Sequence, residues 1–122
     1  MYFDHERLDV YRVAIEFVVW AQELNDRLPV GKRGSAAKQL ERATTSIPLN
    51  IAEGNGKRSR KDRSRYLDIA RGSALESADC LDVLLARGAL TPSNISKGKN
   101  LLRRIVEMLT KLTTSLLRQD AA

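Results

Sequence analysis

Apolar residues recur at steps of three and four along most of the chain, which is the spacing of one face of an α-helix. The first two apolar stripes consist of Val10, Ala14, Phe17, Ala21, Leu24 and Leu28, and of Ala36, Leu40, Ala43, Ile47 and Ile51. The third and fourth consist of Leu67, Ala70, Ala74, Leu81 and Leu84, and of Leu102, Ile105, Leu109, Leu112 and Leu116. The pattern therefore predicts four amphipathic helices.

The residues between the stripes predict where the helices begin and end. Pro29-Val-Gly31 is expected to end the first helix. The second helix is expected to start near Ser35 and to end at Gly54-Asn-Gly56 in a left-handed turn. Pro48 lies inside the second stripe and lacks an N–H, so we expect it to kink that helix or to shift its last turn.

Capping residues mark the start of the third and fourth helices. Ser59 with Asp62 three residues later has the pattern of a capping box, and Thr91-Pro92 places a cap directly before the fourth helix. Connections of about five to eight residues between the stripes favour antiparallel neighbours. Residues 1–122 are therefore expected to form a single all-α domain, an antiparallel up-down-up-down four-helix bundle.

Composition agrees with a globular domain and disfavours several functions. The 122 residues are 43% hydrophobic and 30% charged, with one cysteine, Cys80, and one histidine, His5. No disulfide, histidine-based metal site, catalytic triad or nucleotide-binding glycine motif is therefore expected, and we expect no metal and no cofactor. The acidic start and the lack of a long apolar run favour a cytoplasmic protein with no membrane contact.

The first helix carries more apolar residues than a bundle of this size needs. Beyond its stripe it adds further bulky apolar side chains, which leave little of the helix polar. This surplus predicts contacts with other copies of the chain, although a large core with a half-exposed Trp20 would also account for it. The interface candidates are Tyr11, Val13, Ile15, Val19 and Trp20.

Nearly all the excess charge lies in one short segment. The formal net charge is +6, and residues 57–65 alone carry six bases and one acid. They surround the start of the third helix, where the helix dipole favours anions, so helix stability does not explain them. Binding to phosphate groups would explain them, and a solvated basic loop is the alternative. The six candidate residues are Lys57, Arg58, Arg60, Lys61, Arg63 and Arg65.

Two other groups of charged residues are weaker candidates. Lys97, Lys99, Arg103 and Arg104 open the fourth helix, and we expect them to be solvated surface at the other end of the bundle. Glu53 and Glu76 could form a pair of inward-facing carboxylates for acid–base chemistry, but a structural role is favoured. No enzymatic activity is expected.

The segment from Gln39 to Gly54 resembles the signature of the 23S rRNA intervening-sequence (IVS) protein family, and matching positions extend from Phe3 to Leu109. The signature residues, expected to be structural, are Gln39, Arg42, Ser46, Pro48, Asn50, Glu53 and Gly54. The family is related to the accessory variability determinant of diversity-generating retroelements, which works with nucleic acid.

The resemblance implies a bacterial four-helix bundle that assembles into a homopentameric ring, with no catalytic residues. Arg42 and Arg58 match positions at which the family pattern usually has a base, whereas Arg60, Lys61, Arg63 and Arg65 lie outside that pattern. A ring would repeat the basic segment around an axis and strengthen its attraction for polyanions. The leading hypothesis is a non-enzymatic oligomer that binds RNA, DNA or a ribonucleoprotein through phosphate contacts. The alternative is a scaffold that recruits an acidic protein partner.

Overall fold

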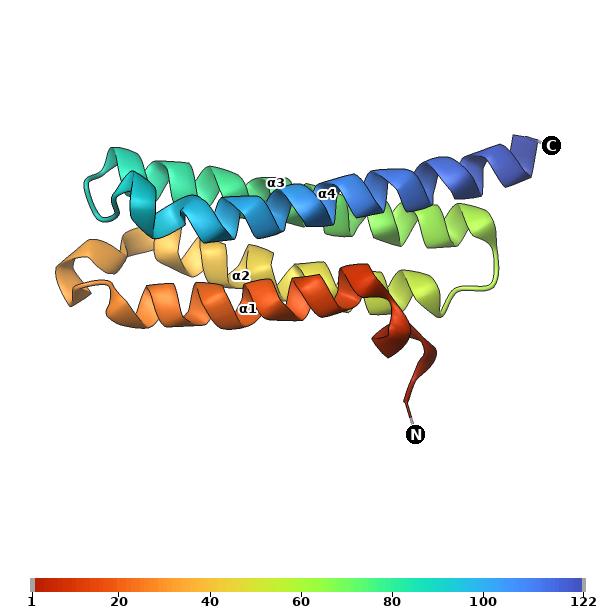
Figure 1. The fold of residues 1–122 in the computed structure, drawn as a ribbon, viewed down its shortest axis with the longest axis horizontal. Helices are drawn as coiled ribbons and strands as arrows, with labels where there is room; N and C mark the ends of the chain where they lie inside the picture. Colours follow the sequence, from red (N-terminus) through yellow and green to blue (C-terminus); the bar gives the residue numbers. More distant parts are fainter. Residues whose placement is uncertain (1, 122) are drawn as a thin grey trace.

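The chain forms a long bundle of four helices, preceded by one short 3₁₀ turn (Figure 1). The computed structural model describes residues 2–121 and the side chains of residues 2–118. The elements are η1 (Asp4–Arg7), α1 (Asp9–Arg27), α2 (Val30–Asn55), α3 (Arg60–Ala86) and α4 (Pro92–Ala121). Successive helices run in opposite directions, and residues 2–121 contain no strand. The predicted all-α, up-down-up-down bundle is confirmed.

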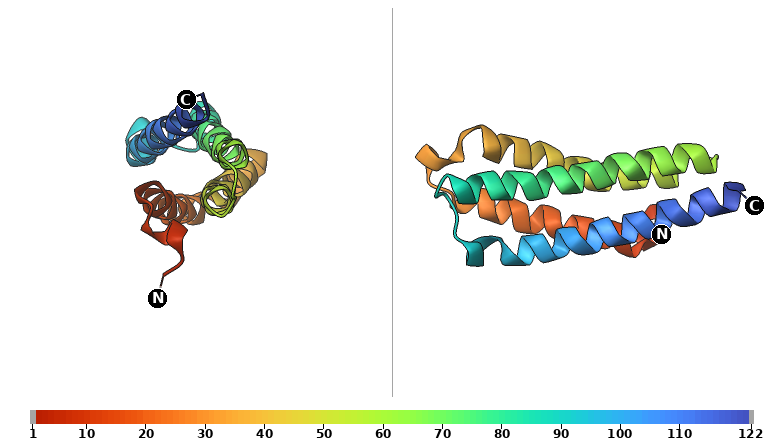
Figure 2. Two further views of the ribbon diagram at one scale, coloured as in Figure 1. Left: turned by 90° about the vertical axis from the view of Figure 1, so that its right-hand side faces the viewer. Right: turned by 90° about the horizontal axis from the view of Figure 1, so that it is seen from above.

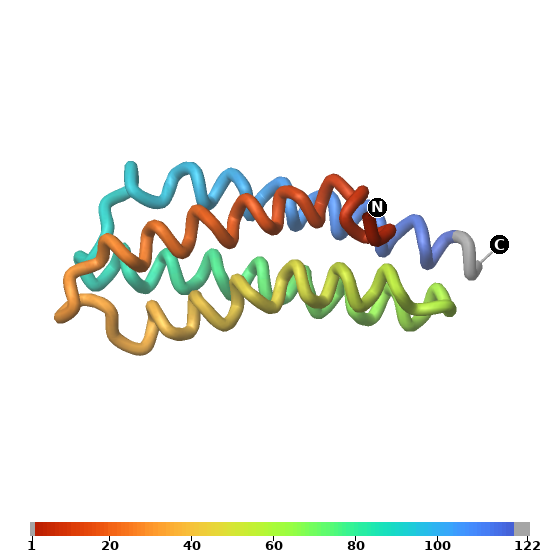
Figure 3. Tube along the Cα trace, turned by 90° about the horizontal axis from the view of Figure 1, so that it is seen from below, coloured from red at the N-terminus to blue at the C-terminus, as the bar shows by residue number. Residues whose placement is uncertain are grey.

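Each helix packs beside its neighbours in sequence, and α4 also closes against α1 (Figures 2 and 3). All the predicted stripe residues of the first three helices are buried, and so are Leu102, Ile105 and Leu109 of α4. Leu112 and Leu116, toward the end of α4, are partly buried against this core. The three-and-four spacing therefore identified the core correctly, because it is the geometry of a helix with one buried face.

The connections are shorter than expected at two of the three turns. They comprise residues 28–29, 56–59 and 87–91. The first is short because α2 begins at Val30 rather than near Ser35. A single residue with non-helical backbone angles, Gly34 (φ 48°, ψ −166°), separates the first turn of α2 from the rest. Glycine tolerates this positive φ, so the chain can turn sharply without a longer loop.

Helix α2 ends at Asn55, within the expected Gly54-Asn-Gly56 segment, but the left-handed conformation expected there is wrong. Gly54 is a buried helical residue, and Gly56 has φ −82°, so no left-handed stop forms. The Gly56 N–H instead bonds the carbonyls of Ala52 and Glu53, each at 3.2 Å. The helix passes through Pro48 with helical backbone angles, and the break within α2 lies at Gly34.

The predicted caps of α3 and α4 are present. The Ser59 hydroxyl accepts a hydrogen bond from the Asp62 N–H at 3.0 Å. At the start of α4, Thr91 Oγ1 accepts from the Asn94 N–H, and the Asn94 side chain accepts in return from the Thr91 N–H at 2.8 Å. Both patterns satisfy amides that would otherwise lack a partner at a helix start.

Part of the predicted subunit surface on α1 is used inside the single chain. Val13 is only 6% exposed, so its assignment to a subunit interface is wrong. Trp20 is half-buried: its ring stacks on Phe17 with 5.6 Å between centroids and lies against Gly98 of α4. Tyr11 is half-buried against the core, and Ile15 and Val19 are exposed. The surplus on α1 therefore serves the core as well as the surface.

Candidate functional site

The six predicted bases lie together at one end of the bundle. Residues 57–65, which we call the basic turn, make up most of the α2–α3 connection and the first turns of α3. The same end carries η1, which is fixed by a 2.9 Å hydrogen bond from Asn55 Nδ2 to Asp4 Oδ2 (Figure 1). The positive end of the α3 dipole adds to the charge of the basic turn, so both attract an anion there.

Two of these bases, Lys57 and Arg65, lie over the ring of Tyr66. Lys57 Nζ lies 5.0 Å and Arg65 Cζ 5.1 Å from the centroid of that ring. Lys57 also forms an ion pair with Glu53 at 3.0 Å, and the hydrogen bond and charge of Glu53 raise the pKa of Lys57. Arg65 lies 3.9 Å from Asp62. Exposed pairs of this kind are weak, so a phosphate group could displace either acid at small cost.

The remaining bases have different surroundings. The Arg63 Nε–H donates to the carbonyl of Lys57 at 2.6 Å and so closes the turn. Arg58 and Lys61 are exposed, and within residues 2–118 neither side chain has a recorded partner. Arg60 is exposed and has an interaction of its own. Arg58 and Lys61 are therefore the bases most available to a ligand, and Arg63 supports the turn.

The second basic group lies at the opposite end of the bundle, as expected, because α3 and α4 start at opposite ends (Figure 1). Lys99 pairs with Asp82 at 2.5 Å, and Arg103 donates to Asn100 at 2.7 Å. Lys97 and Arg104 are exposed. This group is not continuous with the basic turn in a single chain.

Two of the signature residues, Gln39 and Ser46, bond α2 to α3. Ser46 and Ser73 share a hydrogen bond of 2.8 Å, and Gln39 donates to Glu76. Asn50 Nδ2 donates to the Ser46 carbonyl at 2.9 Å. Pro48 is buried, Glu53 pairs with Lys57, and Arg42 is exposed.

Gly54 allows a close approach between α2 and α3. A Cβ atom at this position would lie 3.0 Å from Tyr66 Cβ and 3.1 Å from the Arg63 carbonyl oxygen. Both contacts belong to the segment that carries the basic turn. The signature therefore supports the site structurally and supplies none of its exposed bases.

The proposed pair of carboxylates does not form. Glu53 pairs with Lys57 near the end of α2, whereas Glu76 accepts from Gln39, four turns away along the same α2–α3 seam. No group of three His, Cys, Asp or Glu side chains that could hold a metal ion occurs in the described part of the chain. Among the described residues, no helix is long and apolar enough to cross a membrane.

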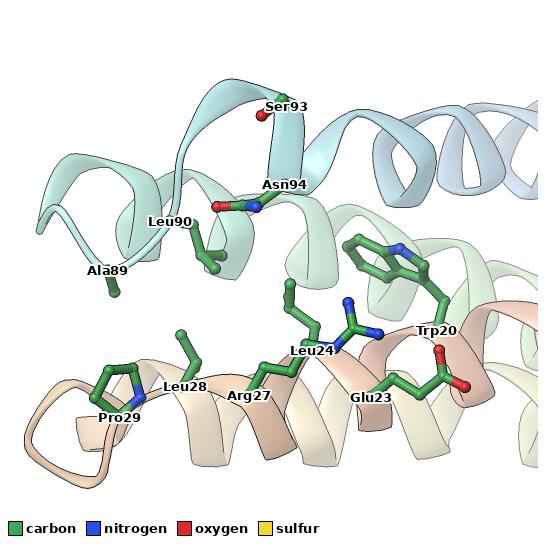
Figure 4. Close-up of a pocket in the computed structure, with 10 residues that line it drawn as sticks. All are labelled: Trp20, Glu23, Leu24, Arg27, Leu28, Pro29, Ala89, Leu90, Ser93 and Asn94. Carbon is green, nitrogen blue, oxygen red and sulfur yellow. The ribbon is translucent and has the colours of Figure 1, made fainter.

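A pocket that the sequence did not reveal lies between the end of α1 and the start of α4 (Figure 4). It has a volume of about 370 Å³, and Leu24, Leu28 and Leu90 contribute apolar walls. Trp20, Glu23 and Arg27 line the side formed by α1. Its lining comes from α1, the α1–α2 connection, the α3–α4 connection and α4, so no local sequence pattern could indicate it.

Cys80 is buried on α3, and burial raises the pKa of its thiol, with smaller contributions from Glu76 and Asp79. We therefore expect Cys80 in the folded protein to react with iodoacetamide at pH 8 much more slowly than a free cysteine, because only the thiolate is nucleophilic. Urea should restore the ordinary rate. Mass spectrometry measures the rate of alkylation. Equal rates with and without urea would contradict the burial of Cys80.

Comparison with known proteins identifies relatives of this fold. A family model described as 23S rRNA-intervening sequence protein matches residues 6–111. The chain is also similar to the crystal structure of a protein of unknown function, from the S23 ribosomal protein family of Bacteroides thetaiotaomicron VPI-5482. The TM-score is 0.79 at 28% sequence identity, and the match covers 85% of this chain and 97% of that one. No curated protein gives a significant match.

Proposed function

The chain belongs to the 23S rRNA-intervening sequence protein family, and we propose that it is a non-enzymatic, homo-oligomeric bundle that binds nucleic acid through the phosphate backbone. The observation that carries this proposal is the basic turn: exposed Arg58 and Lys61 stand beside Lys57 and Arg65 at the positive end of a helix. Phosphate groups satisfy side-chain cations and helix-terminal amides together. RNA, DNA and a ribonucleoprotein all present this chemistry.

The arrangement favours backbone binding over base recognition. Tyr66 is the aromatic residue beside the basic turn, and its ring is already in contact with Lys57 and Arg65. A ring engaged in this way is a poor platform for stacking a base. Affinity should therefore come mainly from the release of counterions, with little dependence on sequence.

Self-association would multiply this weak contact. We propose a closed ring, with five subunits as the resemblance implies, in the bacterial cytoplasm. Each subunit would contribute one basic turn, so a polyanion could bind several at once and gain avidity. Exposed Ile15 and Val19 on α1 supply apolar surface for subunit contacts. The non-enzymatic assignment is supported by Glu53 and Glu76, which lie apart, each with a partner of its own.

Salt dependence provides the direct test. If about five phosphates are engaged, the slope of log K against log salt should be near −4.5, which is roughly a 500-fold loss of affinity between 50 and 200 mM salt. Replacing Arg58 and Lys61 together by glutamine should make the slope less steep by about 1.8, since two phosphate contacts are lost. Fluorescence anisotropy with a labelled RNA or DNA of mixed sequence measures both quantities.

A matched control separates the site from the overall charge. Lys97→Gln with Arg104→Gln removes the same charge from exposed residues at the other end of the bundle. This variant should keep the wild-type slope. Equal losses in the two variants would contradict a site at the basic turn and would leave only a general effect of net charge.

Purification distinguishes the proposal from a protein scaffold. Nucleic acid recovered with the protein from untreated cells, and lost on nuclease treatment, supports the proposed function. Retention of an acidic protein after nuclease treatment, without recovered nucleic acid, would instead favour the scaffold.

A further inference from the structure

The outward side of α1 has an apolar centre with acidic neighbours. Ile15 and Val19, one turn apart, are 39% and 53% exposed. Glu16 and Glu23 are exposed beside them, and neither forms an ion pair within residues 2–118. Arg12, one turn before Glu16, is tied to the Glu6 carbonyl by a 3.2 Å hydrogen bond. We call Ile15, Glu16, Val19 and Glu23 the α1 face.

The outward side of the α2–α3 pair has an apolar centre with basic neighbours. Leu49 and Ile69 are 64% and 46% exposed. They lie at the same level, because the antiparallel helices are aligned by the hydrogen bond between Ser46 and Ser73, three and four residues away. Lys38 and Arg42 are exposed on the same side of α2 as Leu49. We call Lys38, Arg42, Leu49 and Ile69 the α2–α3 face.

An open hollow adjoins Leu49 on this face. Lys38, Arg42 and Leu49 line it, and Glu41 is the acid that shares it. Neither Lys38 nor Arg42 has a recorded ion pair within residues 2–118. An exposed leucine between unpaired cations is a surface for an apolar and acidic partner.

We infer that the α1 face of one copy docks on the α2–α3 face of a second copy. Each face offers two exposed branched apolar side chains, and the charges around them are opposite in sign. Helix α1 lies diagonally across the bundle from α3 in the end-on view (Figure 2), so the outward sides of α1 and of the α2–α3 pair differ. The inference rests on the proposed self-association and assigns the surfaces that form it.

Charge selects this head-to-tail contact over a two-fold symmetric one. In a symmetric contact through α1, Glu16 and Glu23 would face the same two acids of the other copy. In a symmetric contact through α2, Lys38 and Arg42 would face the same two bases. Like charges brought together across an interface are unfavourable, whereas the head-to-tail contact places acids opposite bases. A heterologous contact of this kind builds a ring or an open chain.

Charge exchange tests the pairing. One variant carries Glu16→Arg and Glu23→Arg, and the other carries Lys38→Glu and Arg42→Glu. Each variant alone should fall to the 13.7 kDa mass of one chain, because its two faces then carry the same sign. An equimolar mixture should associate again, because the reversed α1 face of one variant is opposite in charge to the reversed α2–α3 face of the other. The two unreversed faces can pair as they do in the wild-type protein. Light scattering after size exclusion gives the masses, and circular dichroism shows that each variant is folded.

The results distinguish a failure of this pairing from a failure of the proposed self-association. Lys97→Glu with Arg104→Glu is the charge-matched control on α4 and should retain the wild-type mass. Wild-type mass in either reversed variant, or a mixture that stays monomeric, would overturn the pairing of these two faces. A monomeric wild-type protein would overturn the proposed self-association itself, whereas binding of nucleic acid by the basic turn would be measured independently.

Discussion

Gly98→Ala is expected to destabilise the protein by about 3 kcal/mol, which corresponds to a fall in Tm of about 10 °C. Replacing glycine by alanine inside a helix ordinarily raises the free energy of unfolding by about 1 kcal/mol. The change expected for Gly98→Ala therefore has the opposite sign to the one that helix propensity predicts. The cause is Trp20: a Cβ at position 98 would lie 2.2 Å from Cη2 and Cζ3 of its ring. The ring would have to leave its place, and its stacking on Phe17 would be lost.

Gly72 provides the control for this substitution. It is exposed within α3, and a Cβ there meets no atom within 4 Å. Gly72→Ala should therefore raise the stability by up to about 1 kcal/mol. Urea denaturation followed by circular dichroism measures both variants. A stabilising Gly98→Ala would contradict the packing of α1 on α4 described above.

Gly54→Ala is expected to cost about 2 kcal/mol, whereas Gly56→Ala, two residues later, should be tolerated. At position 54 the new methyl group would press on Tyr66 Cβ and on the Arg63 carbonyl, and a backbone atom cannot rotate away. At position 56 the nearest atoms lie at 3.6 and 3.7 Å, which is ordinary contact, and φ is −82°.

The pair also tests how α2 ends. A left-handed stop at Gly56 would make Gly56→Ala costly, because alanine is strained at positive φ. Thermal unfolding of the two variants distinguishes the alternatives. Greater loss at position 56 than at position 54 would contradict the observed end of α2.

The helices and the core could be predicted because they depend on local spacing. Phe17, Leu40, Leu81 and Ile105 are completely or almost completely buried, as their stripes indicated. The Ser59 cap could be predicted for the same reason, since a cap and its amide lie three residues apart. Such features need no knowledge of what the helix packs against.

Features that depend on contacts between helices could not be predicted. The sequence predicts that Gly54 helps to end α2, but in the structure its missing side chain makes room for α3. The sequence predicts that Val13 and Trp20 belong to a subunit interface, but Val13 is buried in the core and Trp20 packs against α4. In the basic turn the six bases were identified, yet their division into paired and available groups depends on Glu53, Asp62 and Tyr66.

The contacts around Tyr66 have a thermodynamic consequence for ligand binding. Lys57 is restrained by Glu53 and by the ring, Arg65 rests on the same ring, and Arg63 is fastened to a carbonyl. Immobilising a long side chain on binding costs about 0.5–1.5 kcal/mol of conformational entropy. Part of this ordering is complete before any polyanion arrives. The basic turn is thus preorganised at Lys57 and Arg65 in particular, and its complexes should gain lifetime from slower dissociation.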